Sequence, residues 1–464
     1  MIVADLALVE TPIPGLVVLH LPVHEDARGW FKENWQRQKM VALGLPDFGP
    51  VQNNMSYNAH RGATRGIHTE PWDKFVSVAT GRVFAAWVDM REGPTFGTTF
   101  HVEIGPDVAV FVPRGVGNSY QALEDGTVYS YLVNEHWRPG TAYPALNLAD
   151  ATAVIPWPIP LAEAEVSEKD LANPTLDAVT PMAPKKTLII GCRGQLGRAL
   201  QVDFPGSDLV DLDELDVTDA EAVAAWPWHE YALVLNAAAY TAVDAAETLD
   251  GRRTAWAANA AAPATLARLS REHGFTLVHY SSEYVFDGTA EEHTEDESLS
   301  PLGVYAQTKA AGDIAIGTAP RHYLLRTSWV IGDGNNFVRT MKRLADNGVS
   351  PSVVDDQTGR LTFTSELSRA TKHLLEVGAP HGTYNLSNGG PVLSWAEITK
   401  TIFRLAGRDE ADVTPTTTAA YFADKPEASP RPLNSAMSLA KIEATGFVPE
   451  DAIVALERYL SADA

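Results

Sequence analysis

The sequence predicts a two-domain protein, with an all-β barrel in the first third and an α/β doubly wound sheet in the rest. Up to about residue 158, short alternating apolar segments such as residues 74–79, 82–89 and 108–112 are separated by frequent Gly and Pro. Regularly spaced strands with turn signals are typical of a β-sandwich or jelly-roll barrel. From Thr187 onward, apolar runs alternate with Ala-rich helical stretches, which predicts a parallel sheet covered by helices.

The boundary between the two patterns predicts three segments. Residues 1–158 form the β domain and residues 185–464 the α/β domain. Residues 159–184 read as a linker, because the stretch around them is rich in Ala, Glu, Asp and Pro without clear periodicity. Buried parallel strands are expected at residues 188–190, 233–235, 277–280 and 323–325, and a helix at residues 255–271.

Composition excludes several classes of partner. The chain has 464 residues, 36 basic and 59 acidic, for a formal net charge of -23. Such a balance repels nucleic acid and anionic membrane surfaces. Cys192 is the only cysteine, which excludes internal disulfides and cysteine metal clusters. The start lacks the pattern of a signal peptide and no apolar run could span a bilayer, so we expect a cytoplasmic protein.

A glycine-rich turn follows the first strand of the α/β domain. Gly191, Gly194 and Gly197 form Gly-x-x-Gly-x-x-Gly where the strand enters a helix, as in the Rossmann fold, and such a turn lets a pyrophosphate approach the helix N-terminus. Asp211 stands where a carboxylate can bond a ribose 2′-hydroxyl, which favours NADH. Arg193 could accept the 2′-phosphate of NADPH, so the choice between NADH and NADPH stays open. The cofactor-binding candidates are Gly191, Arg193, Gly194, Gln195, Leu196, Gly197, Asp211, Asp216, Ala237, Ala238, Ala239, Tyr305 and Lys309.

Three polar residues further along the chain predict hydride-transfer chemistry. Ser282 closes a buried strand, and Tyr305 and Lys309 follow at a spacing that places them on one helix face. An ammonium beside the phenol can lower the pKa of Tyr305 and make it a proton donor near neutrality. With a dinucleotide site, this trio indicates reduction of a carbonyl group.

This half of the chain resembles the extended short-chain dehydrogenase/reductases, and closely the dTDP-4-dehydrorhamnose reductases. The resemblance covers nearly all of residues 187–460 and includes Ser281-Ser-Glu-Tyr-Val-Phe-Asp-Gly288 and Asn236-Ala-Ala-Ala-Tyr-Thr-Ala-Val-Asp244. It implies a Rossmann sheet with a small substrate-binding lobe. It also implies that Tyr305 protonates the C4 oxygen, Lys309 holds the ribose and tunes Tyr305, and Ser282 orients the substrate. Trp329 would line the sugar site.

Two positions depart from that family. Ser282 and Glu283 stand where the family usually has Thr and Asp, and both keep the functional group. Some relatives carry a Glu in the first helix that helps bind Mg²⁺ at a dimer interface. The matching position is Ala199, so no such metal is expected.

The β domain resembles the dTDP-4-dehydrorhamnose 3,5-epimerases, which are metal-independent cupin-like jelly-roll barrels. The match spans most of residues 10–158 and includes Asp26-Ala-Arg-Gly-Trp-Phe31, Gln52-Asn-Asn-Met-Ser56 and Arg65-Gly-Ile-His68. No His-x-His with a downstream Glu occurs at metal-binding spacing, which argues against metal-dependent chemistry.

The resemblance assigns roles to the epimerase residues. His68 would be the base that removes protons beside the C4 ketone, with Asp150 orienting its imidazole. Tyr131 would be the general acid, and Lys74 would stabilise the enolate oxygen. The residues that match nucleotide-sugar-binding positions are Arg28, Glu33, Gln52, Asn54 and Arg65.

Three features of the β domain differ from the family. Asn118-Ser-Tyr120 replaces a His-Gly-Phe, Trp137 stands at the second active-site tyrosine position, and the segment between His68 and Lys74 is shorter than usual. These changes put two expectations in question, namely tight binding of the substrate and epimerisation at both C3 and C5.

Together the two halves predict a bifunctional enzyme that makes dTDP-L-rhamnose from dTDP-4-dehydro-6-deoxy-D-glucose, expected as a homodimer. Three alternatives remain. One is a reductase whose barrel only binds nucleotide or dimerises, and another is a regulatory subunit that binds cofactor without turnover. The third keeps both chemistries but acts on a deoxysugar with one epimerised centre.

Overall fold

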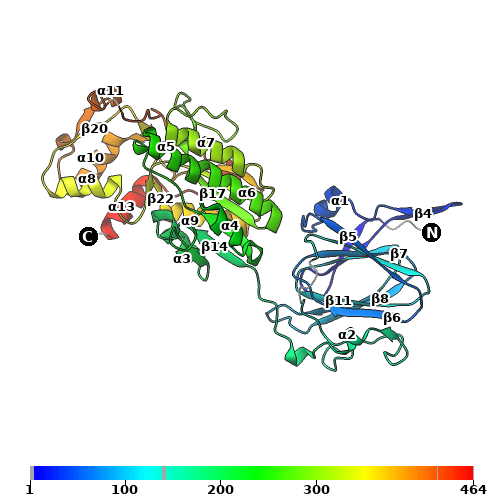
Figure 1. Ribbon diagram of the computed structural model, residues 1–464. Helices are drawn as coiled ribbons and strands as arrows, with labels where there is room; N and C mark the ends of the chain where they lie inside the picture. The colour runs from blue at the N-terminus through cyan, green and yellow to red at the C-terminus, as the bar shows by residue number, and fades with distance from the viewer. Residues whose placement is uncertain (1–4, 138–142, 426, 463–464) are drawn as a thin grey trace. The chain divides into compact units, whose positions relative to one another are not determined.

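The computed structural model describes residues 5–137, 143–425 and 427–462 and divides the chain into two compact units, residues 1–184 and 185–464 (Figure 1). The first unit is a β barrel and the second an α/β domain, which confirms the predicted fold class. No helix within those described ranges is both long and apolar enough to cross a membrane.

Two sheets, antiparallel except for the short parallel pairing of β13 (Glu165–Val166) with β6 (Ala63–His68), face each other in the first unit and enclose its core. Alternate residues of facing strands, among them Val76, Trp87 and Tyr129, are buried between them. One sheet has the order β1 (Ala7–Glu10), β2 (Val17–His20), β10 (Val108–Val112), β7 (Lys74–Thr80), β12 (Thr127–Val133), β5 (Gln52–Asn58). The other has the order β13 (Glu165–Val166), β6 (Ala63–His68), β11 (Val116–Ala122), β8 (Val83–Asp89), β9 (Thr99–Ile104).

A β-hairpin and a short helix near the start of the chain lie outside these sheets. The strands β3 (Val23–Asp26) and β4 (Gly29–Lys32) pair only with each other, and Figure 1 shows their hairpin projecting from the barrel. The short helix α1 (Arg37–Ala42) follows and packs its Met40 against the outer face of the first sheet.

Residues 159–184 are part of the barrel, and the prediction of a linker there was wrong. The strand β13 pairs with β6 through Glu165 and Val166, and the helix α2 (Glu168–Leu171) follows it. Leu176 is buried against the core of the second sheet. The segment lacks periodicity because its two-residue strand and four-residue helix are too short to show one. The unit therefore ends at residue 184.

The second unit is built on a six-stranded parallel sheet, and the four predicted strands all lie in it. The sheet changes direction of winding between β14 and β16, which places a crevice at the carboxyl ends of those strands. The strand order is β15 (Asp208–Val210), β14 (Lys186–Ile190), β16 (Tyr231–Asn236), β17 (Thr276–Ser282), β18 (His322–Thr327), β23 (Gly382–Leu386).

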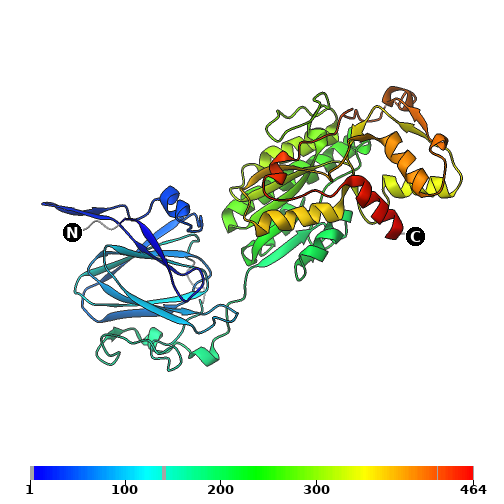
Figure 2. The same ribbon diagram turned by 180° about the vertical axis from the view of Figure 1, so that it is seen from behind.

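Helices cover both faces of this sheet. The helices α5 (Leu249–Trp256), α6 (Ala262–His273) and α7 (Val304–Ile316) lie on the face seen in Figure 1, with α9 (Thr364–Glu376) on the face seen in Figure 2. The helix α3 (Gln195–Asp203) packs beside α9. The helix predicted at residues 255–271 lies within a helical stretch at residues 249–273. Residues 257–261 of this stretch form a π turn between α5 and α6.

A small lobe is built from chain segments that lie between β18 and β23 and after β23. Aromatic and aliphatic side chains of its helices, such as Phe337, Trp395 and Leu456, form its core. Its elements include α8 (Phe337–Asp346), β20 (Ser352–Val354), α10 (Trp395–Leu405), β25 (Thr414–Thr416), α11 (Thr418–Tyr421) and α13 (Ala452–Ala462).

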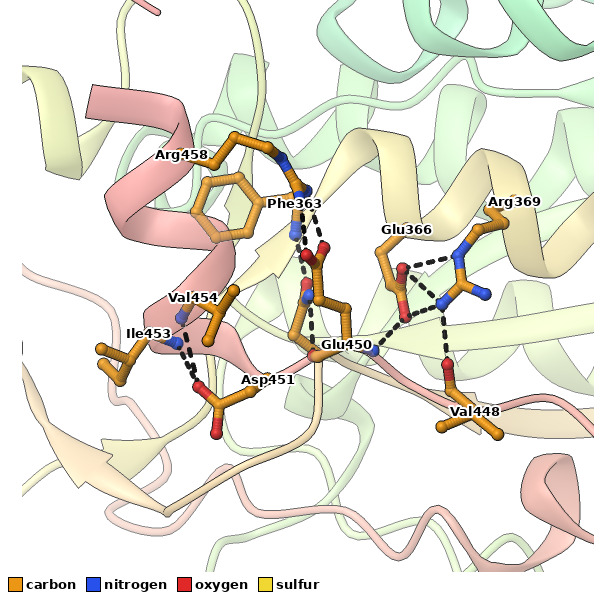
Figure 3. A network of polar contacts seen from close by, with 10 residues as sticks. Phe363, Glu366, Arg369, Val448, Glu450, Asp451, Ile453, Val454 and Arg458 are labelled. Carbon is orange, nitrogen blue, oxygen red and sulfur yellow. Dashed lines mark hydrogen bonds and ion pairs between the residues drawn. The ribbon is translucent and has the colours of Figure 1, made fainter. Parts of the chain in front are cut away.

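A polar network attaches α13 to the sheet domain (Figure 3). The buried Glu366 of α9 accepts hydrogen bonds from Arg369, at 2.7 Å for the shorter contact, and from the Glu450 backbone N–H at 2.8 Å. The Glu450 carboxylate in turn pairs with Arg458 of α13. Arg369 also donates to the Val448 carbonyl at 2.8 Å, so one guanidinium serves both a buried acid and the chain that leads to the last helix.

Candidate functional sites

His68 is the last residue of β6, and its side chain is partly exposed and paired with a carboxylate. Its Nε2 lies 2.8 Å from Oδ1 of the buried Asp170 on α2. Burial opposes ionisation of Asp170, but the hydrogen bond and charge of His68 and the Gly66 N–H lower the pKa of Asp170 below its ordinary value. An ionised carboxylate only accepts, so Nε2 carries the proton and Nδ1 is the basic nitrogen of His68.

The prediction that Asp150 orients His68 was wrong. The Asp150 carboxylate accepts three backbone N–H groups, from Thr152 and Ala153 at 2.8 Å and from Leu176 at 2.7 Å. Asp150 therefore closes a turn, and those three bonds, against the cost of burial, lower its pKa. The sequence did hold a signal for the true partner, since Ser167 and Asp170 have capping-box spacing and Ser167 caps α2.

Tyr131 and Lys74 lie on neighbouring strands near this site. The Lys74 Nζ is 5.8 Å from the centroid of the Tyr131 ring, and it forms a buried ion pair with Glu70. Burial, and then the charge of Glu70, raises the pKa of Tyr131 to about 12, against the opposing effect of Arg65. The phenol therefore keeps its proton at neutral pH, as a general acid must.

The predicted nucleotide-sugar residues fall into two groups. Asn54 stands opposite Tyr131 in the β5–β12 ladder and accepts from Gln52 at 2.8 Å. Arg65, on β6, carries a charge close enough to influence the pKa of Tyr131. By contrast, Arg28 lies in the turn of the exposed β3–β4 hairpin paired with Asp26, and Glu33 is paired with Lys39, so the structure does not join these two to the first group.

The positions that depart from the family have partners of their own. Asn118 stands opposite His68 in the β6–β11 ladder, and its Oδ1 accepts from the Tyr129 hydroxyl and the Trp87 indole, each at 3.0 Å. Trp137 is exposed, and its backbone N–H donates to Gln52 at 3.3 Å. The amide of Asn118 therefore fills a place in the barrel core behind His68.

In the second unit, the glycine turn has the close packing that a dinucleotide site needs. A Cβ at Gly191, where φ is +77°, would lie 2.7 Å from the Ala238 nitrogen, and one at Gly197 would lie 2.1 Å from the Gly191 oxygen. A Cβ at Gly194 would meet only the Gly191 oxygen, at 3.3 Å, which leaves this turn open at the start of α3. The residues present thus fit a bound pyrophosphate.

The polar candidates around this turn have distinct partners. Asp211 accepts from the Arg193 N–H at 2.8 Å, and the Arg193 guanidinium pairs with Asp213 at 2.6 Å and with Glu214. Gln195 does not face open space, because its amide oxygen accepts from the Gly332 N–H at 2.9 Å. Three further candidates also contact protein groups. Leu196 packs into the core beside α9, and the Asp216 carboxylate accepts from the Thr218 hydroxyl. The backbone N–H of Ala237 donates to the Ile190 carbonyl.

Ser282, Tyr305 and Lys309 lie at the carboxyl end of β17 and on α7, all buried or partly buried. Burial, and then the charge of Glu283, raises the pKa of Tyr305, and the neighbouring Ser282 opposes the rise. The expected lowering of the Tyr305 pKa was therefore wrong for this arrangement. Lys309 donates to the Tyr280 carbonyl at 2.7 Å, and burial lowers its pKa to about 8.

Two residues near this trio were missed by sequence reasoning. Asn259 lies in the π turn before α6, bonds both backbone groups of Tyr240 at 2.9 Å and donates to Thr308 at 3.2 Å on α7. Turns of this kind are frequent at functional sites, but no local pattern marks them. Glu283 was noted only as a substitution, yet it is buried and accepts from Ser282 at 2.7 Å.

Trp329 lies in the lobe and adjoins a pocket. It has a positive φ of 43°, and its ring stacks on Trp395 with centroids 3.7 Å apart. Trp395 lines a pocket of about 180 Å³ together with Phe337, Met341, Tyr421, Phe422 and Arg431. Arg431 also pairs with Asp244 at 2.8 Å, so the pocket shares a cation with the loop that follows β16.

The fold and these residues define a two-domain enzyme, with an acid–base site in a jelly-roll barrel and a dinucleotide-dependent reductase site in a Rossmann domain. Residues 10–178 match the family model dTDP-4-dehydrorhamnose 3,5-epimerase, and residues 185–463 match the model RmlD substrate binding domain. The chain therefore belongs to the dTDP-4-dehydrorhamnose reductase family through its second unit, and its first unit belongs to the 3,5-epimerase family.

Individual relatives agree with this division. A protein from Streptococcus pyogenes serotype M6 named "Protein RmlC homolog" is 47% identical over 182 residues, which cover 37% of this chain and 90% of that protein. The dTDP-4-dehydrorhamnose reductase of Aggregatibacter actinomycetemcomitans is 35% identical over 282 residues, 57% of this chain and 95% of the relative. The crystal structure of the Bacillus anthracis reductase in complex with NADP is similar with a TM-score of 0.55 and 30% identity, covering 61% of this chain and all of that one.

Proposed function

We propose that this chain converts dTDP-4-dehydro-6-deoxy-D-glucose into dTDP-L-rhamnose by two consecutive reactions. The barrel epimerises C3 and C5, and the Rossmann domain then reduces the C4 ketone with NADH or NADPH. One observation carries the proposal: a single chain holds both the His68–Asp170 pair and the set of Ser282, Tyr305 and Lys309, in which Ser282 and Lys309 are buried and Tyr305 is partly buried.

The first reaction needs a base, an acid and a cation. In our proposal Nδ1 of His68 removes the proton at C3 or C5, and the electron pair of the broken C–H bond moves to the C4 oxygen. Lys74 stabilises the resulting enolate, since a cation is most useful where negative charge develops. Tyr131, whose raised pKa keeps its proton in place, returns a proton on the opposite face.

The second reaction needs a proton donor and a held cofactor. A bound NADH or NADPH supplies the hydride. Tyr305 gives its phenolic proton to the C4 oxygen, and its raised pKa ensures that this proton is present at neutral pH. Lys309 holds the ribose, and Trp329 with the neighbouring pocket accepts the sugar nucleotide, with Arg431 as a cation for the diphosphate.

The test is NMR of the substrate in deuterated water with the whole protein, first without and then with NADH. Deuterium at C3 and C5 before the cofactor, followed by a rhamnose product after it, is expected. Tyr305→Phe should abolish reduction and leave exchange intact. His68→Asn should abolish exchange, and it should still reduce epimerised substrate that is supplied to it. Reduction without exchange would leave the barrel as a binding module, and exchange at one carbon would indicate a different deoxysugar.

We infer a homodimer joined through the barrel. Phe31 of the β3–β4 hairpin and Met55 and Tyr57 of the edge strand β5 are 65%, 67% and 66% exposed. Apolar side chains on an unpaired strand edge favour addition of a second copy. Sedimentation of the protein should give twice the mass of one chain. The double variant Met55→Lys with Tyr57→Lys should sediment with the mass of a single chain. A cytoplasmic location stays a prediction.

A further inference from the structure

Glu283 occupies an unusual place for a carboxyl group. It follows Ser282 directly at the end of β17, it is 3% exposed, and its Oε2 lies 2.7 Å from the Ser282 Oγ. The Ser282 Oγ also accepts from the Tyr284 N–H at 3.2 Å. Glu283 therefore acts on the hydroxyl that the proposed reduction places beside the substrate ketone.

A serine hydroxyl has one proton to donate and two lone pairs to accept with. An ionised Glu283 can only accept, so it takes the one Ser282 proton, and Ser282 has none left for the C4 oxygen of a substrate. A protonated Glu283 reverses the bond and donates to Ser282. The two lone pairs of Ser282 then serve Glu283 and the Tyr284 N–H, and its proton is free for the substrate.

We propose, resting on the reductase function above, that Glu283 is a positioning residue whose proton decides whether Ser282 donates to the substrate carbonyl oxygen. In the protonated state, Ser282 and Tyr305 both donate to that oxygen as it gains negative charge. In the ionised state, Tyr305 is left as the donor of this pair and a negative charge lies close to the developing alkoxide, which disfavours reduction.

The surroundings of Glu283 place this change in the physiological range. Burial raises the pKa of Glu283 to about 7, and hydrogen bonds from Ser282 and Ser435 oppose the rise. The titratable groups that Glu283 influences are Tyr284, which follows it in the chain, and Tyr305 on α7. Arg431 and Asp244 also act on Tyr284, Asp313 acts on Tyr305, and Lys309 lies on α7 one turn beyond Tyr305. Arg326 compensates Asp313 at 2.9 Å and Asp244 compensates Arg431, so neither carries an unpaired charge toward Glu283.

The experiment is single-turnover reduction of previously epimerised substrate by the full-length protein with NADH, between pH 6 and 8. A single group with a pKa near 7 predicts that the wild-type rate constant falls about tenfold over this range. Glu283→Gln cannot titrate, so its rate constant should change by no more than about twofold, which is the part that loss of the Lys309 proton near pH 8 contributes. Ser282→Ala should be slower, by about tenfold or more, and should also lose the change near pH 7.

Glu283→Asp is the matched control, because it keeps a carboxyl group and should keep a pH-dependent rate. A fall near pH 7 that persists unchanged in Glu283→Gln would overturn the inference, as would a pH-independent wild-type rate. Titrating bound NADH by its fluorescence shows whether each variant retains the cofactor site. Absence of NADH oxidation by the wild-type protein at every pH would instead overturn the proposed reductase function itself, so the two failures are distinguishable.

Discussion

Replacement of Asp170 tests the assignment of the epimerase base most directly. In Asp170→Asn the amide oxygen can still accept from His68 Nε2, so the ring keeps its orientation and loses only the charge that stabilises its protonated form. The bond joins atoms 2.8 Å apart, with a buried carboxylate and a partly exposed imidazole. A charge-assisted bond of this kind contributes about 1.5–3 kcal/mol. We therefore expect exchange at C3 and C5 to slow by about 10- to 150-fold.

The assay is the initial rate of deuterium entry followed by proton NMR without cofactor. Reduction of epimerised substrate by the same sample should be unchanged, which shows that the second unit is intact. The control is Asp150→Asn, which disturbs a turn but not the base, so its exchange rate should stay within a few-fold of the wild type while its melting temperature falls. The reasoning is refuted if Asp150→Asn, still folded, loses exchange and Asp170→Asn does not.

Three further predictions concern the second unit. Arg369→Ala leaves a buried carboxylate without its guanidinium and should lower the free energy of unfolding by about 2 kcal/mol, measured by urea denaturation. Asp213→Asn with Glu214→Gln releases Arg193 for a 2′-phosphate and should tighten NADPH binding several-fold relative to NADH, measured by fluorescence titration; an unchanged ratio would contradict this. Because the pKa of Glu283 is raised from 4.5 to about 7 on folding, its contribution to stability is present below pH 4.5 and is lost as the pH rises through 7. Thermal unfolding of Glu283→Gln should therefore show a smaller decline over that range than the wild type.

Regular elements were predictable because the burial of a strand or helix is visible in the order of its apolar residues. The strands at residues 188–190 and 277–280 are apolar throughout, since helices cover both of their faces, and they appear as β14 and β17. The apolar run at residues 83–88 marked β8 in the same way, because that strand is buried along its whole length. The glycine turn was found because its spacing is imposed by two close backbone approaches, at Gly191 and Gly197.

The site was less predictable where it depends on irregular chain. Asp170 comes from a segment whose side chains are placed by single contacts with β6, so nothing repeats along the sequence. Asp150 stands where the family resemblance predicts the residue that orients His68, and only the three backbone N–H groups around it show its use in a turn. The pKa of Tyr305 could not be inferred from Lys309 alone, because burial and Glu283 outweigh the spacing on the helix.

The placement of Asp170 limits how the two activities can be taken apart. The carboxylate that serves His68 comes from α2, after the last strand of the barrel proper and shortly before the second unit begins. Proteolysis or truncation near residue 158 would remove it and leave a barrel with a base but no counter-charge. A cut between residues 184 and 185 keeps each set of side chains whole. Variants that separate the two halves, or that insert residues between them, should therefore be cut or extended between residues 184 and 185.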